Sequence, residues 1–145
     1  MKKKGNSVAI NLIGDLQVLD TALDDGVPCL LGTADRLGQA QISPKGSMMV
    51  FDATRLAFWE RAGRSALANL RANPKVVVYY RNPALKIAVR FYGTASIVES
   101  GALRDAVWAR TIPLEQGKDP ECKGAAVVIE VQNIGDLSGK ILQQA

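Results

Sequence analysis

The chain has 145 residues, the size of one average domain, and we expect residues 1–145 to form a single domain. Its hydrophobic fraction of 48% is high enough for a buried core, which argues against a disordered protein. The net charge of +4 is mild. That charge fits a small anionic ligand as well as a nucleic acid, and of the two we expect the small anion.

No apolar run is long enough to span a bilayer, and the run Val76–Tyr80 is typical of the longest. The chain starts with Met1 and three lysines, but no small-residue cleavage site follows this basic stretch. We therefore expect residues 1–6 to form a flexible basic tail. The protein is expected in the cytoplasm, without a membrane partner.

The sequence contains no histidine, which excludes several kinds of site. Ser–His and Cys–His nucleophilic pairs, imidazole zinc sites and histidine-ligated haem all need that side chain. Two cysteines cannot form a tetrathiolate site, and we expect no metal. Cys29 lies in an apolar run and is predicted to be a buried, inert thiol rather than a nucleophile or the disulfide partner of Cys122.

The first third of the chain predicts a helix followed by a hairpin. Leucines at spacings of four, three and four indicate one face of an amphipathic helix that ends near Gly26: Leu12, Leu16, Leu19 and Leu23. Residues 27–34 and 39–43 indicate two strands joined by a turn. Proline and glycine in Pro44-Lys45-Gly46 are expected to end the second strand.

The remaining elements are mostly strands. We predict strands at 48–51, 55–59, 75–81, 85–98 and 125–131, helices at 65–72 and 103–110, and a loop at 112–124. Alternating strand–helix units and a G-x-G-x-x-G sequence are missing, which disfavours a Rossmann fold. The pattern predicts a mainly β (α+β) fold, with six or seven antiparallel strands in a barrel and two or three short helices.

The turn Gly63-Arg64-Ser65 opens the predicted helix 65–72. The start of a helix offers unpaired N–H groups and the positive end of the helix dipole, and arginine adds a fork of donors. Such a turn is typical of a phosphate site. The alternative is an ordinary exposed helix cap without a ligand.

Five segments in order resemble the pyridoxamine 5′-phosphate oxidase-like, FMN-binding split β-barrel family. They are Ser43-Pro44-Lys45-Gly46, Leu56–Trp59, Gly63-Arg64-Ser65, Asn73-Pro74-Lys75-Val76 and Arg90-Phe91-Tyr92-Gly93. The resemblance covers roughly residues 27–98 and implies a split barrel that binds FMN at the interface of a homodimer.

The resemblance also implies which residues contact FMN. Arg64 and Ser65 would hold the phosphate, and Ser43, Pro44 and Lys45 would lie beside the ribityl chain and the ring. Many relatives have lysine where this chain has Ala66, and Arg61, Arg64 or Arg90 would compensate for the missing charge. Lys45 could instead be a solvated turn lysine, and Arg90 a charge on the barrel surface. Trp59 and Trp108 are expected in the core rather than against a flavin.

The expected function is that of an FMN-dependent oxidoreductase whose substrate the sequence does not indicate. A flavin carries hydride or electrons itself, so a missing histidine is no obstacle. Some relatives use a deazaflavin. Pyridoxamine phosphate oxidases carry an arginine and a histidine near the C-terminus that grip the substrate, and this chain ends without them. We therefore expect no vitamin B6 oxidation. The alternatives are a flavin carrier for electron transfer, or a barrel that binds another phosphate ligand or nucleic acid.

Overall fold

The computed structural model describes residues 8–63 and 65–145. The expected basic tail (residues 1–6) and Arg64 therefore lie outside the described residues. Gly63 and Ser65, the other two residues of the predicted turn, are described. The strands are β1 (Cys29–Ala34), β2 (Ala40–Lys45), β3 (Met49–Val50), β4 (Arg55–Glu60), β5 (Lys75–Asn82), β6 (Ile87–Val98), β7 (Ala125–Gly135) and β8 (Ile141–Gln144). The helices are η1 (Asp15–Thr21), α1 (Ser65–Ala72), η2 (Pro83–Leu85), α2 (Ala102–Arg110) and α3 (Pro113–Gln116), where η marks a 3-10 helix.

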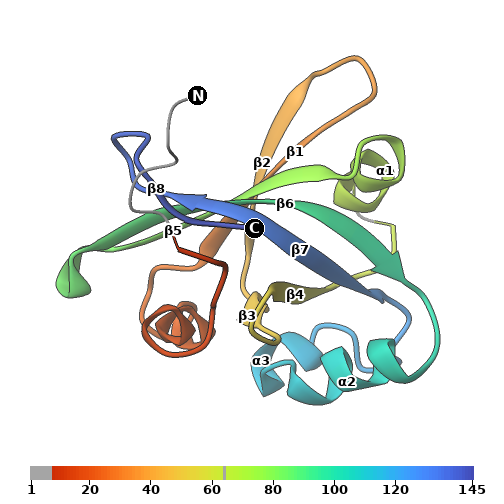
Figure 1. The fold of residues 1–145 in the computed structure, drawn as a ribbon. Coiled ribbons are helices and arrows are strands. Elements are labelled where there is room, and N and C mark those ends of the chain that lie inside the picture. The colour runs from red at the N-terminus through yellow and green to blue at the C-terminus, as the bar shows by residue number, and fades with distance from the viewer. Residues whose placement is uncertain (1–7, 64) are drawn as a thin grey trace.

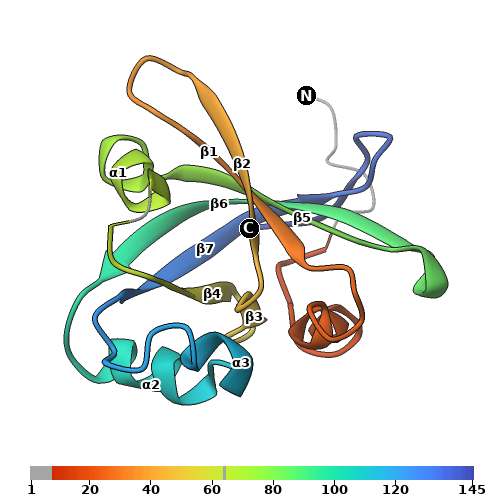
Figure 2. The ribbon, with the colours of Figure 1, turned by 180° about the vertical axis from the view of Figure 1, so that it is seen from behind.

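The strands form one antiparallel sheet in the order β2-β1-β5-β6-β7-β4-β3, with β8 paired to β7. β2 and β3 occupy opposite ends of this order, although only residues 46–48 separate them in the chain. The sheet must therefore curl until its ends approach each other, as Figures 1 and 2 show. This confirms the predicted mainly β, antiparallel split-barrel fold.

The curled sheet encloses the larger of two hydrophobic clusters, in which Phe58, Val78 and Phe91 are fully buried. A smaller cluster lies between β4, β7 and α2 and contains Trp59 and Val107. Successive residues of a strand point to opposite faces, so β4 contributes one face to each cluster. The helices α2 and α3 lie beside β4, whereas α1 lies near the β1–β2 hairpin (Figures 1 and 2).

Two expectations for the first third of the chain need correction. The leucine-rich segment forms the 3-10 helix η1 instead of an α-helix, although Leu12 and Leu19 are fully buried as the spacing predicts. β2 does not stop before Pro44 but continues through Lys45. Proline is tolerated there because, among the strands described, β2 pairs with β1 alone, so the missing N–H can face away from the ladder.

In the second half, α1 has the predicted bounds, and α2 differs from its prediction by one residue at the start. The prediction of an unbroken loop at 112–124 is wrong, because α3 interrupts it. β7 runs on to Gly135, and β8 pairs with its end through Asn133 and Gln144. The polar residues Gln132 and Asn133 break the apolar pattern that marks the strand in the sequence.

Candidate functional site

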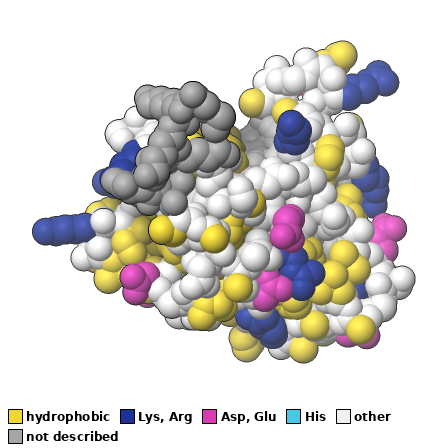
Figure 3. All heavy atoms as spheres, in the orientation of Figure 1, with side chains coloured by type: hydrophobic (Ala, Val, Ile, Leu, Met, Phe, Trp, Pro, Cys, Tyr) yellow, Lys and Arg dark blue, Asp and Glu magenta, His cyan; other side chains and the backbone are white. Residues whose placement is uncertain are grey.

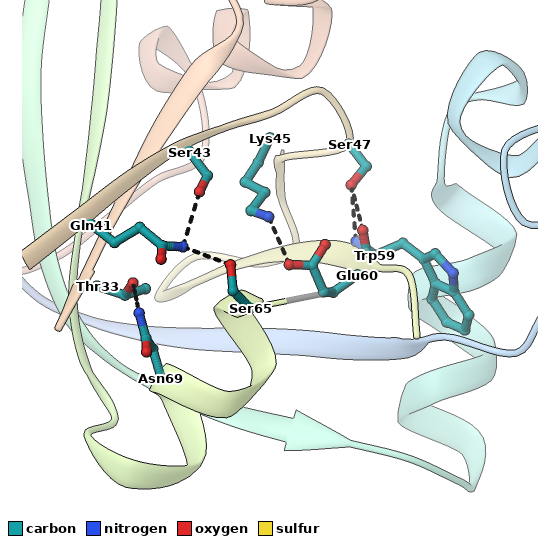
Figure 4. Close-up of polar contacts among 9 residues, drawn as sticks. All are labelled: Thr33, Gln41, Ser43, Lys45, Ser47, Trp59, Glu60, Ser65 and Asn69. Carbon is teal, nitrogen blue, oxygen red and sulfur yellow. Dashed lines mark hydrogen bonds and ion pairs between the residues drawn. The ribbon is translucent and has the colours of Figure 1, made fainter. Parts of the chain in front are cut away.

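Several of the predicted site residues lie where β2, the end of β4 and the start of α1 meet (Figure 4). Gln41, Ser43 and Lys45 alternate along β2 and are partly or fully buried, whereas the intervening Ile42 is 71% exposed. The period of two along a strand places the three polar side chains on the same face. This polar strip, defined as Gln41, Ser43 and Lys45, runs past the first residue of α1.

The strip ends in a buried ion pair. Lys45 Nζ lies 2.6 Å from Glu60 Oε2, and the two side chains are only 8% and 5% exposed. The ammonium also lies 5.7 Å from the centre of the Phe58 ring. Lys45 is therefore not the solvated turn lysine considered as an alternative. Sequence reasoning missed Glu60, whose only signal is a charged residue closing the apolar run Leu56–Trp59.

Two amide–hydroxyl hydrogen bonds join α1 to the β1–β2 hairpin. Gln41 Nε2 donates to Ser65 Oγ at 3.0 Å and to Ser43 Oγ at 3.4 Å. Asn69 Nδ2 donates to Thr33 Oγ1 at 3.1 Å. Figure 4 shows the Ser65 side chain pointing from α1 toward Gln41. The structure thus brings together Ser43 and Ser65, two of the predicted phosphate and ribityl contacts.

A pocket of about 580 Å³ opens beside the start of α1 and is lined by Gly63, Ser65, Arg71, Arg104 and Lys123, among others. Arg71 forms an exposed ion pair of 3.2 Å with Glu99. Arg104 donates to the carbonyl oxygens of Cys122 and Gly124, at 2.7 and 2.9 Å. Arg71 lies in the helix that the predicted turn opens, whereas Arg104 and Lys123 lie far from that turn in the sequence and are brought to it by the fold.

Two of the three residues that we expected to compensate for Ala66, Arg61 and Arg90, line other pockets. Arg61 lines a second pocket of about 360 Å³ together with Lys45, Glu60 and Lys118. Arg90 lines a third pocket with Tyr79 and Tyr92 on the outer face of the sheet. Its Nη1 donates to the carbonyl oxygen of Asp136 at 3.4 Å. Arg90 therefore lines a different pocket from those lined by Ser65 and by Lys45.

A closed polar network lies on the other face of β4. Trp59 Nε1 donates to Asp119 Oδ2 at 2.8 Å, and the backbone N–H groups of Lys123 and Gly124 also donate to this carboxylate. Burial raises the pKa of Asp119, but these hydrogen bonds outweigh it and the pKa lies below the ordinary value. The rings of Trp59 and Trp108 pack 4.7 Å apart. Both tryptophans thus belong to the second cluster, as expected.

The cysteines are both free thiols, and Cys29 is buried as predicted. Burial, reinforced by the carboxylate of Asp20, raises the pKa of the Cys29 thiol to about 12, which makes it a poor nucleophile. Among the described residues, no three acidic or cysteine side chains gather in a way that could hold a metal ion. None of the helices described is both long and apolar enough to cross a membrane.

Comparison with known proteins places this geometry in context. The model of the family described as pyridoxamine 5′-phosphate oxidase matches residues 17–133. HupZ from Group A Streptococcus is similar in structure, with a TM-score of 0.69 and 23% identity over 89% of this chain and 97% of that one. An FMN-binding protein from Syntrophomonas wolfei has a TM-score of 0.63 and 18% identity over 85% of this chain and 86% of its own.

A pyridoxamine 5′-phosphate oxidase-related, FMN-binding protein from Nostoc punctiforme has a TM-score of 0.67 at 12% identity, covering 85% of this chain and 81% of that one. At these identities the likenesses to solved structures show the fold alone. No curated protein matches the chain.

Proposed function

Because the chain belongs to the pyridoxamine 5′-phosphate oxidase family, we propose that it is a flavoprotein that binds FMN through the start of α1. The observation that carries this proposal is the position of Ser65. Its hydroxyl lies at the first residue of α1, at the rim of a pocket that also contains Arg71, Arg104 and Lys123. Hydroxyl, helix start and basic side chains together form the donor set that a phosphate dianion requires.

The basic residues of this pocket supply what Ala66 lacks. A lysine at that position would add one positive charge to the helix start, and three basic side chains line the pocket instead. Arg71 is partly neutralised by Glu99, but Arg104 is held in place by two backbone carbonyls. A guanidinium fixed in this way loses little side-chain freedom when it binds an anion. Arg64 is proposed as an additional phosphate ligand from the turn itself.

The polar strip on β2 is proposed to lie along the rest of the cofactor. Ser43, Pro44 and Lys45 would contact the ribityl chain and the ring, with Lys45 held by Glu60. FMN, when bound, supplies hydride or single-electron transfer, and the protein supplies binding and orientation. The ion pair would leave this part of the site close to electrically neutral. Lys45 would therefore act as an oriented hydrogen-bond donor more than as a free positive charge.

We propose that the protein is an oxidoreductase that acts without vitamin B6 as substrate. Residues Ile141–Gln144 form β8 and are hydrogen bonded to β7, and Gln143 also bonds to the backbone of Asn11. The C-terminal segment is thus engaged in the sheet, and it contains neither arginine nor histidine. Conversion of pyridoxamine 5′-phosphate at enzymatic rates would contradict this part of the proposal.

The proposed working form is a homodimer located in the cytoplasm. The outer face of β2, β1, β5 and β6 presents an apolar hollow of about 360 Å³, in which Ile42 is 71% and Tyr92 41% exposed. Contiguous exposed apolar surface of this kind is typical of an interface, and two-fold symmetry is the commonest arrangement. A second copy covering this face would also bury Arg90, which lines the same hollow, at the interface.

A ligand other than flavin is the alternative. On the face drawn in Figure 3, basic and acidic side chains lie interspersed among hydrophobic ones. This view shows no broad basic surface of the kind that tracks a nucleic-acid backbone. Among these ligands, another small phosphate compound bound in the α1 pocket is the alternative that the lining of this pocket favours.

The absorption spectrum of the protein purified without added cofactor tests the proposal directly. We expect flavin bands in the visible range, and FMN as the flavin released on denaturation. A colourless protein that also fails to bind added FMN would contradict the proposal. If flavin binds, turnover with NAD(P)H and an electron acceptor distinguishes an oxidoreductase from a flavin carrier.

A further inference from the structure

Gln41 lies between two serine hydroxyl groups and donates to both. One side-chain amide has two N–H donors, and in Gln41 they go to Ser65 Oγ at 3.0 Å and to Ser43 Oγ at 3.4 Å. The residue is partly buried on β2, and Ser65 is 24 positions further along the chain. Gln41 therefore connects the polar strip of β2 directly to the first residue of α1 (Figure 4).

The direction of these hydrogen bonds decides what the serines can offer to a ligand. A hydroxyl group has one proton and two acceptor lone pairs. When the amide N–H occupies a lone pair, the hydroxyl proton stays free to be donated elsewhere. Both serines then present a donor, which is the polarity that a phosphate oxygen or another anionic oxygen requires.

We propose that Gln41 is a positioning residue that fixes Ser43 and Ser65 as hydrogen-bond donors toward a phosphate-bearing ligand. The inference rests on the proposed function and deepens it, because it assigns the selectivity for the phosphorylated flavin to a residue outside the predicted site. Gln41 itself need not touch the ligand. Its effect passes through the orientation of two hydroxyl protons.

A purely mechanical role for Gln41 makes a different prediction, and the chain contains a matched control. The Asn69 amide donates to Thr33 Oγ1 at 3.1 Å and thereby ties the same helix to the same hairpin. This second hydrogen bond involves neither Ser43 nor Ser65. If Gln41 only anchored α1, removing the Asn69 amide would have the same consequence for ligand binding.

Two substitutions of Gln41 separate loss of the amide from reversal of its polarity. Gln41→Met keeps the length of the side chain and removes both N–H donors. Gln41→Glu replaces the donors by acceptors, so each serine would turn its proton toward the carboxylate and its lone pairs toward the ligand. Gln41→Glu should therefore be the more harmful change for an anion. Asn69→Leu removes the control hydrogen bond at similar size.

The experiment measures the dissociation constants of FMN and riboflavin from flavin fluorescence for the wild type and all three variants. Thermal unfolding with and without inorganic phosphate provides a second readout. For Gln41→Met we expect about a tenfold loss of the preference for FMN over riboflavin, as for a lost charge-assisted hydrogen bond. Gln41→Glu should lose more, and both should lose the stabilisation by phosphate. Asn69→Leu should keep the preference.

Equal weakening of FMN and riboflavin by Gln41→Met would overturn the inference, as would a loss of preference in Asn69→Leu of the same size. If the wild type fails to bind FMN, the proposed function fails, and the phosphate measurement decides on Gln41. Stabilisation by phosphate that disappears in Gln41→Met would still support the positioning role. Stabilisation that persists in this variant, or a wild type insensitive to both FMN and phosphate, would contradict it.

Discussion

Trp59 and Glu60 are consecutive residues at the end of β4, and their surroundings differ in one decisive respect. The Trp59 indole donates to Asp119, whose two carboxylate oxygens already accept three hydrogen bonds from the protein. Glu60 accepts from Lys45, whose ammonium has three N–H donors and one hydrogen bond among the described residues. The Trp59 side is complete without a ligand, whereas the Glu60 side retains donors. This difference separates a structural polar network from one suited to binding.

Breaking the Lys45–Glu60 pair should have the largest effect on stability. Lys45→Met leaves the Glu60 carboxylate buried without its partner, and such losses typically cost about 3–5 kcal/mol. The double variant Lys45→Met, Glu60→Gln should recover most of this free energy of unfolding but not the affinity for FMN. Denaturant unfolding and FMN titration of both variants measure the two quantities. Full recovery of FMN binding in the double variant would show that the ion pair stabilises the fold and does not contribute to FMN binding.

Truncating Asp119 should destabilise the protein far more than it weakens FMN binding. Asp119→Ala removes the acceptor of the buried Trp59 N–H and of two backbone N–H groups. Leaving such donors unpaired should cost about 3 kcal/mol, measured by denaturant unfolding. The folded variant should still bind FMN, with a small loss of affinity because Asp119 also holds the backbone of Lys123 and Gly124, which line the pocket beside α1. A large loss of FMN affinity in the folded variant would show that the two faces of β4 are coupled.

Arg64→Ala should weaken FMN binding by roughly ten- to a hundredfold, which is the contribution of one or two charge-assisted hydrogen bonds. The loss should exceed that of the Lys45→Met, Glu60→Gln double variant, because Glu60 already matches the charge of Lys45. Riboflavin, which lacks the phosphate, should be little affected. Parallel titrations with the two flavins measure this. Equal losses for both would move the phosphate contact from Arg64 to Arg71, Arg104 or Lys123.

The smallest expected effect is a pH dependence on the Trp59 side. The pKa of Asp119 is lowered in the fold, so its stabilising contribution is present above the pKa of an unfolded aspartate, about 3.9. It is lost as the pH falls through the lower pKa of the folded state. The difference in melting temperature between wild type and Asp119→Asn should therefore be constant near neutral pH and shrink below about pH 4. A difference that grows on acidification would contradict the hydrogen-bonded carboxylate.

The sequence predicts best those features that depend on near neighbours. Alternating apolar residues indicate most strands, and the bounds of α1 follow from Ser65 and from Asn73-Pro74. Gly26, expected to end the leucine-rich helix, has a φ of 76°, but η1 already ends at Thr21. β8 escapes prediction because its partner strand is polar at the point of pairing, between Asn133 and Gln144.

The site is predictable only in part, because it also depends on contacts between residues that are far apart in the chain. The segment order of the family indicates Ser43, Lys45 and Ser65, and the structure places them around one region. The contacts of such residues come from distant parts of the chain. Gln41 is hydrogen bonded to Ser65 across 24 positions, and on the other face of β4 Trp59 is hydrogen bonded to Asp119 across 60. No local sequence pattern predicts such a long-range contact. The basic pocket residues Arg104 and Lys123 reach the start of α1 only because the sheet is curled.

The three-residue connection between β2 and β3 closes the curled sheet covalently. Residues 46–48 hold together β2 and β3, the two end strands of a seven-strand order. The Lys45–Glu60 pair lies at the same place and spans from β2 to β4. A circularly permuted chain that begins and ends within residues 46–48 would keep every pair of neighbouring strands. It would lose the covalent closure, and two free sheet edges would be available for pairing with other molecules.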